Sequence, residues 1–205
     1  KVGIPVRVLL RPRAGDFLYD EDEFELLCRQ AARFAGLGAD GIVIGVLTPE
    51  GALDTERMNA LMTYADGCGV TLHRAFDVCR DPFEALEAAR QLGIDTILTS
   101  GQQAACTDGA SLLRELHEKS RGEVEIMAGA GVNADSIRTL APETGVRTFH
   151  LSAKKAVPGG MVFRRENVPM GIPGLNEFEF LRCDAASVRA AREALDAVCA
   201  ARKEK

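Results

Sequence analysis

A histidine and an aspartate with the chemistry of a reactive site lie close together in residues 70–77. Apolar and polar residues alternate there, which predicts a β-strand with His73 and Asp77 on one face. A period of two places them about 13 Å apart, which excludes a direct pair but allows both to line one cavity. An imidazole in such a cavity can transfer a proton or bind an anion or a metal. We therefore expect His73 and Asp77 to be catalytic candidates.

Arginines accompany these two residues. Arg11 ends a predicted strand at residues 4–11, Arg13 follows in the next loop, and Arg74 belongs to the histidine-bearing stretch. A guanidinium can bind a carboxylate or a phosphate through two parallel hydrogen bonds. The alternative is a structural ion pair with a nearby acid such as Asp16. We expect Arg11, Arg13 and Arg74 to be substrate-binding candidates.

Further substrate-binding candidates lie near the ends of later predicted strands, where small and polar residues gather. They are Ser100, Gly101, Gly129, Gly131, His150 and Ser152. Glycine lets backbone N–H groups approach an anion closely, and a second inward histidine would share a polar cavity with His73. The alternatives are that the glycines permit tight packing, that the histidines are structural, and that Asp77 caps the turn before Asp81.

The metal-binding potential of the chain rests on six scattered cysteines, which form no CxxC motif. This spacing indicates reduced thiols rather than disulfides or a structural zinc site. Cys79 and Cys106 are the thiols nearest to the candidate site. Because Cu(I) prefers clustered thiolates or thioethers, the residues alone favour ordinary cysteines and leave the metal ligands unknown.

Composition excludes several classes of function. The chain has 205 residues, and 25 Lys and Arg against 30 Asp and Glu give a formal charge of −5 at pH 7. This balance argues against nucleic-acid partners and against binding to a membrane surface. No apolar run is long enough to span a bilayer, and the first residues resemble no signal peptide. We expect a cytoplasmic protein.

The elements that position the candidates alternate between strand and helix. Strands are predicted at residues 4–11, 41–47, 70–77, 96–101, 125–132 and 148–153. Helices are predicted at residues 20–37, 54–66, 81–93, 108–119, 135–140 and 184–202. Such alternation is typical of right-handed βαβ units that build a parallel sheet. The fold class is therefore α/β, in a single domain over residues 1–205.

The arrangement we expect is a TIM-type (β/α) barrel with six of its eight strand–helix units present. An open, doubly wound sheet is the alternative, but it would require a glycine-rich phosphate fingerprint at the first strand–helix turn. The sequence there is RPRAGD, at residues 11–16. A barrel without two units leaves unpaired edges at residues 4–11 and 148–153, which predicts a covering partner and hence a homo-oligomer, most simply a dimer.

Five segments together resemble one known family. They are RPRAGDF at 11–17, GVL at 45–47, HRAFD at 73–77, LTSGQ at 98–102 and MAGAGV at 127–132. In this order and spacing they are similar to the CutC family, named for copper homeostasis. The resemblance implies a TIM barrel whose first two strands are absent from this chain. The thiols proposed as copper ligands in the family lie largely in that absent part.

Three functional hypotheses follow. The resemblance implies a cytoplasmic CutC-like protein assigned to copper homeostasis, with copper as the expected cofactor and Cu(I) binding expected in the complete family protein. The residues themselves favour an enzyme that acts on a small anionic metabolite, with His73 as acid or base and with Arg11 and residues 129–131 holding the anion. The third is a barrel fragment whose site is incomplete and inactive.

Overall fold

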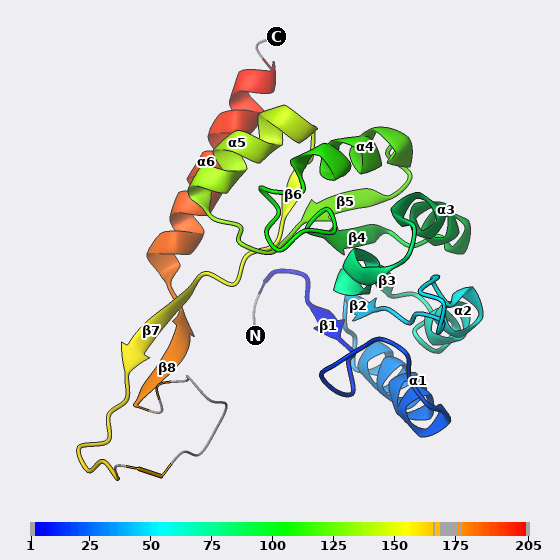
Figure 1. Cartoon of the computed structure of the whole chain (residues 1–205), viewed down its shortest axis with the longest axis horizontal. Coiled ribbons are helices and arrows are strands. Elements are labelled where there is room, and N and C mark those ends of the chain that lie inside the picture. The colour runs from blue at the N-terminus through cyan, green and yellow to red at the C-terminus, as the bar shows by residue number, and fades with distance from the viewer. Residues whose placement is uncertain (1–2, 166, 169–175, 177, 204–205) are drawn as a thin grey trace.

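The strands of the protein form one six-stranded parallel sheet, in the order β1-β2-β3-β4-β5-β6 (Figure 1). The computed structural model describes residues 3–165, 167–168, 176 and 178–203. The strands are β1 Arg7–Leu9, β2 Gly41–Ile44, β3 Gly69–Leu72, β4 Thr96–Thr99, β5 Glu125–Ala128 and β6 Thr148–Phe149. Each pairs only with its sequence neighbours, which confirms the predicted α/β architecture of consecutive strand–helix units.

Helices follow the strands and cover one side of the curved sheet (Figure 1). They are α1 Glu21–Gly36, α2 Thr55–Tyr64, α3 Pro82–Leu92, α4 Ala110–Ser120, α5 Ala134–Thr144 and α6 Ala185–Lys203. Local sequence explains where several begin. Asp20 and Asn133 each form a capping box, and Asp81 caps α3 with Pro82 in its first turn.

The two faces of the sheet differ in their environment. Ile42, Ile97 and Ile126 are buried in the main hydrophobic core. Side chains alternate along a strand, so the next residues, such as Val43 and Leu98, point to the opposite face, and both are only half-buried. This second face is where the candidate site lies.

The predicted strand at residues 70–77 is wrong in its second half. β3 ends at Leu72, and Arg74–Val78 forms a 3₁₀ helix. His73 caps this helix, because its side chain accepts the backbone N–H of Ala75 and turns the chain out of the strand. The other predicted strands also end early, since pairing stops where the chain enters the loops at the carboxyl edge.

Near the C-terminus the structure contains a two-stranded antiparallel sheet that the sequence did not predict. β7 Lys154–Pro158 pairs with β8 Glu179–Cys183, and the hairpin extends away from the main sheet (Figure 1). The segment 148–153, predicted as one strand, contains only the two residues of β6 before its loop. Nearly every residue of the hairpin is exposed, so no burial pattern marks it in the sequence.

None of the helices in the described ranges is both long enough and apolar enough to cross a membrane.

Candidate functional site

Four of the predicted site residues line one cavity of about 390 Å³ on the open face of the sheet. They are Arg11, His73, Arg74 and His150. The first follows β1, the next two follow β3, and His150 follows β6. Residues that are far apart in sequence therefore meet because the carboxyl ends of parallel strands lie at the same edge of the sheet.

His73 is the most buried of these residues, with 5% of its surface exposed. Its Nδ1 atom accepts the backbone N–H of Ala75 at 3.1 Å, so the proton of the neutral ring is on Nε2. Nε2 is buried and has no hydrogen-bond partner within the described part of the chain. Burial, reinforced by the positive charge of Arg11, lowers the pKa of His73 to about 4. At neutral pH the imidazole is therefore an uncharged N–H donor.

Arg11 lies close to His73, and an aromatic ring joins them. The Arg11 Cζ atom is 4.6 Å from the centroid of the Phe17 ring, and the His73 ring centroid is 4.9 Å from the same point. The guanidinium donates to the Gly15 carbonyl at 2.7 Å. Among the described residues, Arg11 has no carboxylate within ion-pair distance, so its charge is uncompensated.

Gly45 provides the room for the histidine ring. A Cβ atom at this position would lie 2.5 Å from Cε1 and 2.6 Å from Nδ1 of His73. Contacts this short do not occur between real atoms, so any larger residue would displace the ring. The glycine of the GVL segment thus fixes the place of His73 in the cavity wall.

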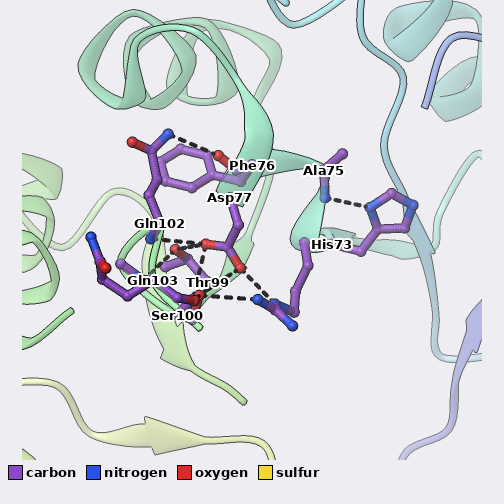
Figure 2. A network of polar contacts seen from close by, with 10 residues as sticks. His73, Ala75, Phe76, Asp77, Thr99, Ser100, Gln102 and Gln103 are labelled. Carbon is purple, nitrogen blue, oxygen red and sulfur yellow. Dashed lines mark hydrogen bonds and ion pairs between the residues drawn. The ribbon is translucent and has the colours of Figure 1, made fainter. Parts of the chain in front are cut away.

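Asp77 does not line this cavity and instead organises a separate polar network (Figure 2). Its carboxylate, 5% exposed, accepts the backbone N–H groups of Ser100 and Gln102 at 2.9 and 3.3 Å. Arg74 Nε donates to the same carboxylate at 2.6 Å, and Arg74 Nη2 donates to the Ser100 hydroxyl at 3.1 Å. Figure 2 shows His73 pointing away from this network. Asp77 and Ser100 therefore hold Arg74 at the rim of the cavity.

Several other predicted residues already have protein partners. Arg13 donates to Asp16 at 2.9 Å and to the Leu18 carbonyl at 2.7 Å. The N–H of Gly101 donates to the Thr99 hydroxyl, and that of Gly129 to the Thr99 carbonyl, each at 2.9 Å. The structure thus uses these groups internally, and their ligand-binding role stays a prediction.

Gly131 and Ser152 border a second cavity, of about 430 Å³, beside the start of α5. The first backbone N–H groups of this helix are occupied, because the Asn133 side chain accepts from Asp135 and Ser136 at 2.9 Å. The structure separates these two candidates from the cavity at His73, and their role also stays a prediction.

The described residues do not fit a metal centre. No group of three His, Cys, Asp or Glu side chains in the described ranges could hold a metal ion. Cys79 is buried, burial raises the pKa of its thiol to about 11, and Gln102 Nε2 lies 3.4 Å from its sulfur. Burial also raises the pKa of Cys106. Thiols in this state are poor sources of the thiolate that Cu(I) prefers.

Sequence reasoning missed the apolar part of the cavity. Leu9, Phe17, Val43, Leu98 and Met127 line it together with the polar candidates. The alternation of β-strands indicates the direction of Leu9, Leu98 and Met127, which lie two residues before the candidates Arg11, Ser100 and Gly129. Phe17 lies in a loop, where no periodicity indicates direction.

The parallel sheet, its covering helices and a cavity at the carboxyl ends of the strands define an α/β protein of the β/α-barrel type. The model of the CutC family matches residues 1–155, and the chain belongs to the CutC family. The resemblance of the five sequence segments is thereby confirmed.

Individual relatives agree with this assignment. The chain is 47% identical over 166 residues to a family protein CutC of Bacteroides fragilis, covering 81% of this chain and 66% of the relative. It is 39% identical over 198 residues to a family protein CutC of Porphyromonas gingivalis, covering 96% of this chain and 80% of the relative. The chain thus spans about two thirds of the length of its Bacteroides relative.

A solved structure shares the fold. The crystal structure of CutC from Streptococcus agalactiae, named as a candidate copper homeostasis protein, superimposes with a TM-score of 0.70. The two sequences are 32% identical, and the match covers 72% of each chain.

Proposed function

We propose that this CutC-family chain binds a small organic or inorganic anion between Arg11 and His73. The observation that carries the proposal is that Arg11 and His73 line one cavity and that the buried Nε2–H of His73 has no acceptor among the described residues. Leaving a buried donor unpaired costs about 1–3 kcal/mol, so a native protein rarely does so without reason. A carboxylate or phosphate oxygen would accept this hydrogen bond and offset the charge of Arg11.

The rest of the rim supports the same chemistry. Arg74 is held by Asp77 and Ser100 in an orientation that brings it to the cavity, and His150 lines the opposite part of the sheet. Preorganised donors bind an anion well because they lose little conformational freedom on binding. These residues form a binding site whose geometry exists before the ligand arrives.

Binding is better supported than proton transfer. An efficient acid or base has a pKa near the working pH, and a histidine with a pKa of about 4 is almost wholly neutral at pH 7. The enzyme hypothesis, with His73 as acid or base, would require a ligand that raises this pKa by more than two units. We therefore assign His73 the role of a hydrogen-bond donor.

A role in copper homeostasis is our second proposal, and its support is the name of the Streptococcus agalactiae relative. The thiols of the described residues do not form a cluster that fits Cu(I). We expect this chain to bind Cu(I) no more tightly than isolated cysteines do. Both proposals concern this chain, which we further propose to be six units of an eight-unit barrel.

Thermal unfolding of the 205-residue chain tests anion binding. Chloride would be replaced by phosphate, or in a second series by acetate, at constant ionic strength. A ligand that binds only the folded state stabilises it by RT ln(1 + L/Kd), where L is the ligand concentration, so the melting temperature rises with the concentration of the anion. We expect stabilisation by at least one of the two anions and at least a tenfold loss of its affinity in Arg11→Gln.

The control variant is Arg138→Gln, which removes an arginine from an exposed ion pair on α5. It should respond to the anions as the wild type does. The proposal is wrong if neither anion stabilises the wild type, or if Arg11→Gln and Arg138→Gln respond equally.

A further inference from the structure

Tyr19 is a buried polar side chain in the loop between β1 and α1. Its surface is 3% exposed, and its ring belongs to the main hydrophobic core. The hydroxyl is buried and forms no hydrogen bond of normal geometry with any described residue. An unpaired buried hydroxyl destabilises a protein, and phenylalanine would fill nearly the same space without that cost. Packing alone therefore does not explain a tyrosine at this position.

The same loop carries Arg11 and holds its side chain from two sides. Nη2 donates to the Gly15 carbonyl at 2.7 Å, and the guanidinium Cζ lies 4.6 Å from the centroid of the Phe17 ring. A guanidinium has five N–H donors in one plane, so one hydrogen bond and one ring contact fix its orientation only in part. A third contact from the loop would define the direction in which Arg11 presents its remaining donors.

The Tyr19 hydroxyl is placed to make this third contact. Burial raises the pKa of Tyr19, whereas the charges of Arg11 and Arg13 and a hydrogen bond from Arg11 lower it. Arg13 is already used elsewhere, because it donates to Asp16 at 2.9 Å and to the Leu18 carbonyl at 2.7 Å. Its Cζ lies over the face of the Tyr19 ring, 5.4 Å from the centroid. Arg11 is therefore the cation that can use the hydroxyl.

We infer that Tyr19 is a positioning residue of the anion site, whose hydroxyl oxygen accepts a hydrogen bond from Arg11. Together with Phe17, the hydroxyl orients the guanidinium towards the cavity that Arg11 shares with His73. A donor that is oriented beforehand loses less conformational freedom when an anion binds. Tyr19 itself does not contact the anion. This inference rests on the proposed function and adds the residue that orients its charged donor.

Tyr19→Phe removes the hydroxyl and keeps the ring. In titrations with phosphate and with acetate, we expect at least a fivefold loss of affinity for the anion that stabilises the wild type. Without anion, the urea midpoint should stay equal or rise, because the variant loses only a poorly paired buried group. The matched control is Tyr64→Phe, at a tyrosine of α2 that is 53% exposed, and it should bind as the wild type does.

The outcomes separate the inference from the proposed function. If Arg11→Gln loses affinity and Tyr19→Phe does not, the inference is wrong and the proposed function stands. If no anion requires Arg11, the proposed function is wrong. A double variant tests whether Tyr19 acts through Arg11, in which case Tyr19→Phe should cause no further loss in the Arg11→Gln background. A further loss there would mean that the hydroxyl contacts the anion itself, which contradicts a positioning role.

A measurement without anion tests the contact directly, also if Tyr19→Phe does not fold. The chain has two tyrosines and no tryptophan, so 13Cζ-labelled tyrosine gives two resonances. Tyr64→Phe assigns them. Arg11→Gln should shift the Tyr19 resonance and leave that of Tyr64 in place, whereas Arg138→Gln, in an exposed ion pair of α5, should shift neither. A stationary Tyr19 resonance in Arg11→Gln would overturn the inference.

Discussion

Asp77 accepts the backbone N–H of Ser100 at 2.9 Å, and the Ser100 hydroxyl lies 3.0 Å from the same carboxylate. This contact joins the 3₁₀ helix after β3 to the loop after β4, across 23 residues of sequence. It also places Arg74, which contacts both residues, at the rim of the cavity. The carboxylate predicted to be catalytic is thus a structural tie between two neighbouring units.

Replacing Asp77 by asparagine should therefore cost stability. The amide nitrogen would face backbone N–H donors and could not accept from them, so we expect a loss of about 1–3 kcal/mol in the free energy of unfolding. Urea denaturation of both proteins measures it. The matched control is Asp135→Asn. The Asp135 side chain is 94% exposed, so this substitution should change the free energy of unfolding by less than about 1 kcal/mol. Equal effects of the two substitutions would contradict a structural role for Asp77.

The low pKa of His73 makes stability depend on pH. The ring has a pKa of about 4 when folded and its ordinary value of 6.5 when unfolded, so below pH 6.5 the unfolded chain binds the proton first. Stability must fall as the pH is lowered from 6.5 towards 4. Between pH 7.5 and 5, the wild type should lose about 2 kcal/mol more than His73→Gln.

Chemical denaturation at a series of pH values measures this difference. Titration of every other carboxylate and histidine is common to both proteins and cancels in the comparison. Parallel stability curves for the wild type and His73→Gln would show that burial does not hold the ring in its neutral form.

Gly45→Ala tests the contact that positions the histidine. The new methyl group would need the space of the His73 ring, and overpacking of this kind costs about 1–3 kcal/mol. We expect a lower melting temperature and a loss of anion-induced stabilisation. Gly36→Ala is the control, since a Cβ at that position of α1 meets nothing within 4 Å. It should be neutral or slightly stabilising, and similar behaviour of the two variants would refute the steric argument.

Thiol reactivity should follow burial. At pH 8 a disulfide reagent such as DTNB should label the exposed Cys183 first, whereas the buried Cys28, Cys79 and Cys106 should react only after unfolding. Cys183→Ser should remove the fast phase of labelling, and Cys79→Ser should leave it intact. Fast labelling of Cys79 in the folded protein would mean that its thiol is accessible and partly ionised. Cys79 would then again be a candidate metal ligand.

The sequence predicted the order of the elements because each strand and helix carries its own signal. The buried strand at Ile42 is an almost continuous apolar run, and the helices begin at capping residues such as Asp20 and Asp81. The sequence did not predict where the strands stop. Strand pairing ends by geometry at the carboxyl edge, and the chain beyond it is shaped by single contacts, such as that between His73 and Ala75.

The candidate site was predictable in part because the order of the strands was predictable. Arg11 and His73 follow strands of a parallel sheet, so topology alone brings them together. Counting along one strand predicts that Asp77 lines the same cavity as His73, but the 3₁₀ turn directs the carboxylate to Ser100 instead. Phe17, which contacts both Arg11 and His73, comes from a loop whose path depends on the complete fold.

The sequential strand order also has a consequence for folding. Every parallel pair in the main sheet joins neighbouring strands of the chain, so each new strand closes a loop of similar, modest length. Such a topology can grow outward from any interior pair, for example β2 and β3. β1 and β6 stand at the two ends of this series of pairs among the described strands. Because Arg11 and His150 follow these two strands, the anion site is complete only when all six strands have paired.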